Sequence, residues 1–285
     1  MRRISRRDFL RISALSLGAV AVSKGLSGCS SSSDSAPVVR FDHGVASGDP
    51  MQDRVLIWTR VTPENLAEDD LLVAWEVAAD EGFQNLVHNG ETTVQRAHDF
   101  TIKVDVLNLL PGQTYFYRFR AESGLVSPHG RTRTLPESGV EQVRFAVVSC
   151  SNYQAGFFHV YAEIAKEPDL DALLHLGDYI YEYDNRGYAT EDAERLGRTV
   201  PDDNDVELLT LEDYRKRYAI YRRDADSQAV HARVPLIAVW DDHEVANDAW
   251  IVFAWRDSTG RNEWTSVTPR DCHHDFMLGA DARPA

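Results

Sequence analysis

Three short stretches of the sequence contain residue types that bind metal ions or transfer protons. Residues 149–152 read Ser-Cys-Ser-Asn, residues 177–182 read Gly-Asp-Tyr-Ile-Tyr-Glu, and residues 241–244 read Asp-Asp-His-Glu, with Asn247 shortly after them. They supply a thiol, a carboxylate with a phenol three residues on, a carboxylate beside an imidazole, and an amide. Each of these groups can be a ligand of a metal ion.

The residue types leave the identity of the ion open. Cys150 and Tyr181 offer a thiolate and a phenolate, which together favour ferric iron. Asp178, Asp242 and Asn247 offer the carboxylate and amide oxygens that calcium, magnesium and manganese prefer. Zinc also fits, because it binds thiolate, imidazole and carboxylate.

Each stretch follows an apolar run that reads as a buried strand, namely 143–148, 171–176 and 236–240. Helical patterns at 156–166 and 211–223 lie between these runs. Buried strands that alternate with helices indicate a parallel sheet. Because ligands bind beyond the carboxyl ends of such strands, we expect the three stretches to meet there.

Taken singly, the candidate ligands have structural explanations. Cys150 could be a small buried apolar residue, Tyr181 a core residue, and Asp242 the N-cap of a following helix. Their joint placement at three strand ends favours a metal site. The acidic, turn-rich segment 184–207 lacks periodicity, and a loop of that length is usually functional or disordered.

The N-terminal half has a different pattern. Short β-branched and aromatic runs are separated by turn residues, including Asn89-Gly90 and Pro111-Gly112, which predicts an antiparallel β-sandwich. Residues 109–117 resemble a strand entry of fibronectin type III-like modules. The expected strands are 55–59, 71–77, 101–106 and 114–119.

Composition describes an ordinary soluble protein with an acidic balance. The chain has 285 residues, is 43% hydrophobic and 26% charged, and carries a net charge of −15. Nucleic-acid binding needs clustered Lys and Arg, so this balance argues against it.

The N-terminus resembles an export signal. Arg6-Arg7 is followed by Phe9-Leu10 and by the apolar run 12–22, which is too short to span a bilayer but suits a signal peptide. Residues 26–29 (Leu-Ser-Gly-Cys) resemble a lipobox. We therefore expect residues 1–28 to be a twin-arginine lipoprotein signal peptide and Cys29 to be lipidated, which would anchor the protein in the cell envelope.

Residues 29–37 are mostly small and polar and are expected to form a flexible tether. With Cys29 lipidated, Cys150 and Cys272 remain, and in an exported protein a disulfide between them is an alternative to metal binding by Cys150.

Longer motifs make the chain recognisable. Together they resemble the alkaline phosphatase D (PhoD-type) family of metallophosphoesterases from about residue 38 to residue 250. The matching segments are 41–50 (Phe-Asp-His-Gly-Val-Ala-Ser-Gly-Asp-Pro), 58–61 (Trp-Thr-Arg-Val), 149–150, 175–182 and 240–245 (Trp-Asp-Asp-His-Glu-Val).

The resemblance implies a multidomain fold. A fibronectin III-like β-sandwich would occupy residues 38–136, and an α/β metallophosphoesterase domain of the αββα type would occupy residues 140–285. It also implies hydrolysis of phosphate monoesters, diesters or both, outside the cytoplasm and after export by the twin-arginine machinery. Iron with calcium is the implied metal pair, with zinc or manganese as alternatives from the wider superfamily.

Residue roles follow from the same resemblance. Cys150, Asp178 and Tyr181 would bind iron, and Asp178 would bridge to a second ion. A hydroxide between the ions would attack phosphorus, so that no Ser or Cys nucleophile is needed.

The second ion would take Asp242, which stands where the wider superfamily has Asn in a Gly-Asn-His-Glu/Asp motif, or Asn247. His243 matches the histidine that donates to the phosphate or to the leaving group.

The resemblance fades from about residue 251, so we expect the phosphoesterase domain to be incomplete, with exposed apolar surface and an unpaired sheet edge. Two other functions stay open. One is a truncated, inactive remnant, and the other is a surface lipoprotein that acts as a binding module. We expect a monomer.

Overall fold

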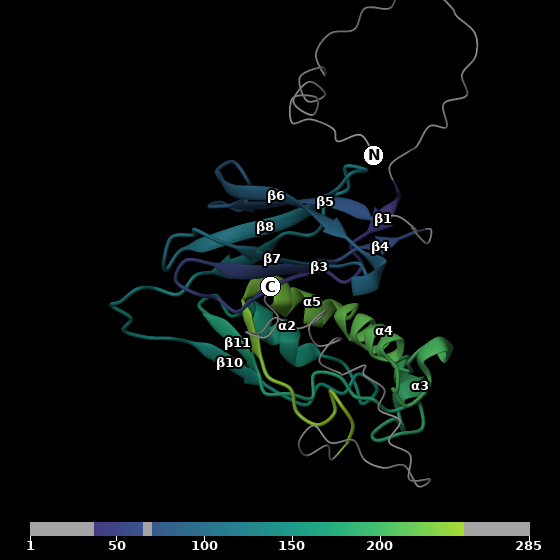
Figure 1. Cartoon of the computed structure of the whole chain (residues 1–285). Coiled ribbons are helices and arrows are strands. Elements are labelled where there is room, and N and C mark those ends of the chain that lie inside the picture. Colours follow the sequence, from purple (N-terminus) through teal and green to yellow (C-terminus); the bar gives the residue numbers. More distant parts are fainter. Residues whose placement is uncertain (1–36, 65–69, 248–285) are drawn as a thin grey trace, which may run out of the picture. The chain divides into compact units, whose positions relative to one another are not determined.

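The structure is a computed structural model that describes residues 37–64 and 70–247 (Figure 1). The predicted signal peptide, Cys29, the tether except for its last residue, and Cys272 lie outside these residues. None of the helices in the described ranges is long and apolar enough to cross a membrane.

Two antiparallel layers form the N-terminal half. Strand β8 (Thr114–Ala121) alternates buried and partly buried residues along its length, as a strand with one face on a core does. One layer has the order β6-β5-β8-β9, and the other contains β2-β3-β7. The remaining bounds are β1 Val39–Arg40, β2 Val45–Gly48, β3 Val55–Arg60, β4 Thr62–Pro63, β5 Leu71–Ala78, β6 Leu86–Val94, the 3₁₀ helix η1 Arg96–His98, β7 Thr101–Val106 and β9 Gly130–Arg133.

The C-terminal half contains the predicted parallel strands. Strands β10, β11 and β12 pair in parallel and in that order, which confirms the prediction from the apolar runs. Their bounds, with those of the helices, are β10 Phe145–Val148, α2 His159–Lys166, β11 Ala172–His175, α3 Ala193–Leu196, the 3₁₀ helix η2 Asp202–Asn204, α4 Leu211–Arg222, α5 Ala225–Arg233 and β12 Leu236–Ala238.

Helix α5 was not predicted. It begins directly after α4 because the side chain of Asp224 accepts hydrogen bonds from the N–H groups of Asp226 and Ser227 and so caps a new helix. Helix α4 begins at a capping box in which Thr210 and Asp213 bond reciprocally. Both helices are labelled in Figure 1.

One mixed sheet joins strands from both halves of the chain. Leu236 of β12 pairs in parallel with Gly48 of β2, which gives the order β10-β11-β12-β2-β3-β7. Strand β3 is therefore buried on both faces. Val55 and Ile57 belong to the core between the antiparallel layers, whereas the alternate residues of the strand pack on the core that contains α4 and α5. The fold is thus β-rich with mixed sheets, and the fibronectin III-like and αββα assignments stay predictions.

The prediction of a turn at Asn89-Gly90 was wrong, because both residues lie inside β6. Gly90 pairs across the sheet with Trp75, and a Cβ atom at Gly90 would lie 2.6 Å from Cζ2 of the Trp75 ring. Here the glycine makes room for an aromatic ring on the neighbouring strand.

Strand β10 is the edge of the mixed sheet within the described residues. Its partly buried Ala146 and Val148 pack on the helical core, whereas Phe145 and Val147 are 51% and 57% exposed. Val239, just after β12, is also exposed. Apolar side chains are therefore exposed in this part of the chain, and the incompleteness of the domain stays a prediction.

Candidate metal centre

The loops that follow β10 and β11 are tied together by their backbones. Cys150 N–H donates to Gly177 O at 3.1 Å, and Ser151 N–H donates to Asp178 O at 2.8 Å. Cys150 and Asp178 both adopt left-handed backbone conformations, with φ of 59° and 53°. Such strain in residues other than glycine is concentrated at functional sites, where the surrounding structure holds it in place.

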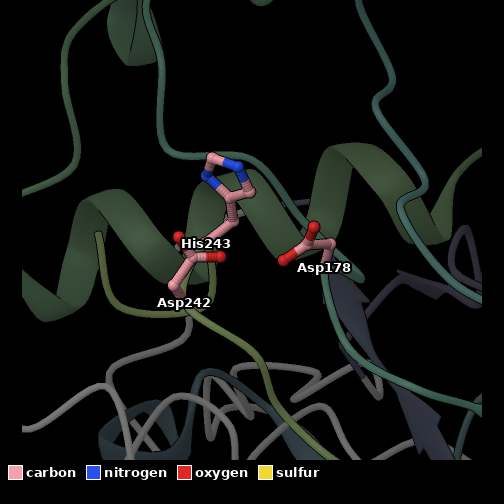
Figure 2. Close-up of side chains that lie close together, drawn as sticks. All are labelled: Asp178, Asp242 and His243. Atoms are coloured by element: carbon pink, nitrogen blue, oxygen red, sulfur yellow. The ribbon is translucent and has the colours of Figure 1, made fainter. Parts of the chain in front are cut away.

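The third strand end completes a cluster. Asp178, Asp242 and His243 offer ligand atoms that all lie within 4.8 Å of one another. Figure 2 shows one carboxylate oxygen of Asp178 and one of Asp242 turned toward each other. The structure thus brings the three strand ends together, as the sequence indicated.

The Asp178 carboxylate has an incomplete set of partners. The residue is only 7% exposed, and its Oδ2 accepts hydrogen bonds from Cys150 Sγ at 3.3 Å and from Tyr181 OH at 3.2 Å. Its Oδ1 is buried and has no hydrogen-bond partner in the described structure. A buried carboxylate oxygen without a donor is rare, and a bound cation would satisfy it. The residues present therefore fit a metal ion.

Tyr181 lies within reach of the same carboxylate. Burial raises the pKa of the Tyr181 phenol, and the charges of Asp178 and Cys150 raise it further. A bound cation reverses this effect, because its charge stabilises a phenolate that neighbouring anions oppose. The Tyr181 phenol is therefore expected to lose its proton and become a ligand only when a cation is bound beside it.

Cys150 is exposed and forms no disulfide with any residue in the described ranges. The interpretation of Cys150 as a buried apolar residue was therefore wrong. Its left-handed backbone turns the chain out of the sheet after β10, so its thiol lies beside Asp178. The alternative disulfide to Cys272 concerns a residue outside the described ranges.

His243 is held by a carboxylate that the sequence analysis did not single out. Nδ1 of His243 lies 2.8 Å from Oε2 of Glu182, which is 1% exposed. The ring of Tyr181 stacks obliquely on the imidazole, with centroids 4.2 Å apart. Burial lowers the pKa of His243, but the hydrogen bond and charge of Glu182 and the charges of Asp178 and Asp242 outweigh it and raise the pKa above its usual value.

Asn247 is exposed, and its backbone N–H donates to Oε1 of Glu182 at 2.6 Å. This bond leaves Glu182 with both oxygens engaged, one by His243 and one by Asn247. Asn247 as an amide ligand stays a prediction.

Glu244 joins two of the strand ends and was also missed. Its buried carboxylate accepts hydrogen bonds from the backbone N–H of Asp178 at 3.1 Å, of Asp241 at 2.7 Å and of Tyr179. Burial raises its pKa to about 7. The sequence Asp241-Asp242-His243-Glu244 indicated a segment rich in possible ligands. It did not show that Glu244 binds backbone N–H groups while Asp242 and His243 face the cluster.

The neighbouring Ser151 is not an activated nucleophile. His175 Nε2 lies 3.1 Å from Ser151 Oγ, but its Nδ1 accepts the N–H of Gly177 at 3.3 Å, so Nε2 carries the ring hydrogen and donates. Burial also lowers the pKa of His175 to about 4. A histidine in this tautomer cannot take a proton from Ser151.

Comparison with known proteins shows which families and structures this chain resembles. A model of the PhoD-like phosphatase family matches residues 145–271, and a model of the N-terminal domain of the same family matches residues 28–136. Alkaline phosphatase D of Bacillus subtilis (strain 168) is 42% identical over 215 residues, which cover 73% of this chain and 36% of that protein. A solved structure described as PhoD is 36% identical with a TM-score of 0.71, and the match covers 86% of this chain and 46% of that one.

The fold and these comparisons relate the chain to the phosphatases. Within that class it belongs to the PhoD-like phosphatase family, as the resemblance of its motifs predicted. The chain spans less than half the length of the two relatives it matches.

Proposed function

We propose that the chain is part of a metal-dependent phosphoesterase that hydrolyses phosphate monoesters, diesters or both. The observation that carries the proposal is the Asp178 carboxylate, which is buried, lacks a donor at Oδ1 and lies in a cluster with Asp242 and His243. Membership of the PhoD-like phosphatase family supports the reaction class.

The residues would divide between two ions. Cys150, Asp178 and Tyr181 would hold the first, and Asp178 with Asp242 or Asn247 would hold the second. A bound ion supplies Lewis acidity and lowers the pKa of coordinated water. Iron with calcium is the proposed pair, with zinc or manganese as alternatives.

His243 would act on the substrate itself. Because Glu182 engages Nδ1, the other ring nitrogen, Nε2, is available to donate to a phosphoryl oxygen or to the leaving group. The raised pKa of His243 favours the protonated, donating form.

Metal analysis and hydrolysis assays of the purified chain test the proposal. Elemental analysis should find bound metal, and p-nitrophenyl phosphate or bis(p-nitrophenyl) phosphate should be hydrolysed in a metal-dependent way. Asp178→Asn is the matched control, because it removes the charge at constant volume. A chain without metal and without activity would overturn the proposal and leave the inactive remnant or the binding module as the function.

We also propose export by the twin-arginine machinery and anchoring of the protein to a membrane through a lipid on Cys29. Changing Arg6 and Arg7 together to Lys should leave the protein in the cytoplasm. Changing Cys29→Ala should release it from membranes, because the lipid supplies the binding free energy. Membrane retention of the Cys29 variant would contradict the lipoprotein proposal.

We propose further that a fibronectin III-like domain ends near residue 136 and that an αββα phosphoesterase domain begins near residue 140. The exposed residues Leu135, Val140 and Val143 support an accessible connection between them. Within residues 38–247, limited proteolysis with mass mapping should place the first cut between residues 135 and 145. A first cut inside one of the sheets would contradict this boundary.

A further inference from the structure

Helix α4 contacts the backbone of the segment that carries Tyr181 and Glu182. Arg217 is fully buried, and its Nη1 donates to Tyr181 O at 2.5 Å and to Tyr183 O at 2.7 Å. The two carbonyls lie on either side of Glu182 along the chain. One guanidinium nitrogen therefore fixes the backbone around a residue whose side chain holds His243.

The rest of the guanidinium contacts the far end of the long loop between residues 184 and 207. Nε donates to Asn204 Oδ1 at 2.8 Å, and Nη2 donates to Asn204 O at 2.9 Å and to Val206 O at 3.4 Å. All five acceptors are neutral oxygens, and burial lowers the pKa of Arg217. Burying a charge against neutral acceptors is costly, so packing alone does not explain this residue. A planar fork of donors can hold two chain segments at a fixed separation, which a lysine cannot do.

Tyr221, one turn further along α4, contacts the same segment from its donor side. Its buried hydroxyl accepts the backbone N–H of Tyr181 at 3.1 Å and that of Tyr153 at 3.1 Å. Burial raises the pKa of Tyr221 to about 12, so the group stays a phenol. Tyr153 belongs to the loop after β10, which also contains Cys150. The hydroxyl therefore links the loop that offers the thiol to the segment that offers the phenol.

We infer that Arg217 and Tyr221 are positioning residues of the metal centre. They fix the backbone of residues 181–183, so that Tyr181 meets Asp178 and Glu182 meets His243. Neither side chain is a ligand, and both act through the residues they hold. The inference rests on the proposed function in one respect, namely that the cluster binds metal.

Titration of the full chain with Zn²⁺ alone tests the inference. Arg217→Met should weaken zinc binding by about 10- to 100-fold, the usual effect of losing a partner that orients ligands. Arg217→Lys should lose less, because an ammonium can still reach one carbonyl. Tyr221→Phe should weaken binding by about 10-fold. Asp178→Asn defines the zinc that binds elsewhere on the chain, and that amount is subtracted.

A control variant separates positioning from general destabilisation. Phe119→Leu leaves a cavity in the core between the antiparallel layers, where Phe119 is fully buried. It should lower the melting temperature and keep the zinc affinity within about twofold of the parent.

Each outcome decides a different point. A parent chain that binds no more zinc than Asp178→Asn would overturn the proposed metal centre and this inference with it. Parent binding that is unchanged in Arg217→Lys and Tyr221→Phe would overturn the positioning roles alone. Arg217→Met failing to fold leaves the test to those two conservative variants. Equal loss of zinc affinity in Phe119→Leu would show that general stability, and not the position of the ligands, causes the effect.

Discussion

Oε2 of Glu182 lies 2.8 Å from Nδ1 of His243, and Oε1 of the same carboxylate accepts the backbone N–H of Asn247 at 2.6 Å. One buried carboxylate thus fixes both the imidazole and the chain that follows it. The loop after β11 therefore determines where the histidine of the loop after β12 points. An imidazole held in this way keeps one ring orientation and one available nitrogen.

This geometry predicts that Glu182 and His243 work as a unit. Glu182→Ala should lower kcat for p-nitrophenyl phosphate by about 10- to 100-fold, because the imidazole loses its orienting partner. Glu182→Gln keeps an acceptor and should lose less. The double variant Glu182→Ala/His243→Asn should be no slower than His243→Asn alone, because the first residue acts through the second. Additive losses would show that Glu182 has an independent role.

A second prediction compares two residues that offer ligands to the same ion. Asp178→Asn should abolish metal binding more completely than Tyr181→Phe, because a bridging carboxylate would serve two ions and the phenol one. Elemental analysis of both variants after identical purification measures the difference. Equal metal loss would count against a bridging role for Asp178.

A third prediction concerns acid stability. Burial lowers the pKa of His175 to about 4, compared with about 6.5 for an exposed histidine. The unfolded chain therefore binds more protons between these values, and the stability due to neutral His175 is present above pH 6.5 and is lost as the pH falls toward 4. The full effect is about 3 kcal/mol.

Urea unfolding of the parent and of His175→Gln at pH 7.5 and at pH 5.0 measures this effect. The parent should lose more unfolding free energy than the variant between the two pH values. Two other buried histidines, His43 and His231, also have lowered pKa values and act in the same direction, so the difference between the two proteins is the relevant quantity. An identical loss in both would contradict the linkage to His175.

A fourth prediction tests the contact between two strands of the N-terminal half. Gly90→Ala would place a Cβ atom 2.6 Å from the Trp75 ring and should cost about 1 kcal/mol of unfolding free energy. Trp75→Leu in the same background should recover part of this cost. Gly156→Ala is the control, because a Cβ atom there meets nothing within 4 Å. A neutral Gly90→Ala would show that the ring moves aside freely.

Local patterns of the sequence predicted the strands and the strand-end cluster well. Apolar runs before residues 149, 177 and 241 identified β10, β11 and β12, and the rule that parallel strands end at one edge brought Asp178 and His243 together. The Asn89-Gly90 turn failed because a turn-forming pair also fits a strand in which glycine faces an aromatic ring. Helix α5 was missed because its start depends on a cap directly after another helix.

Residue type and short-range periodicity were enough to predict which residues can bind metal and which strand ends carry them. Which carboxylates face the cluster and which support it depends on the tertiary structure. Asp178 keeps an unsatisfied oxygen, whereas Glu182 holds His243 and Glu244 holds backbone N–H groups. These roles depend on contacts between residues more than sixty positions apart, such as Glu244 with Asp178 at a separation of 66. Burial and hydrogen bonds between such distant residues form only when the chain is packed, so residue type and local sequence do not predict them.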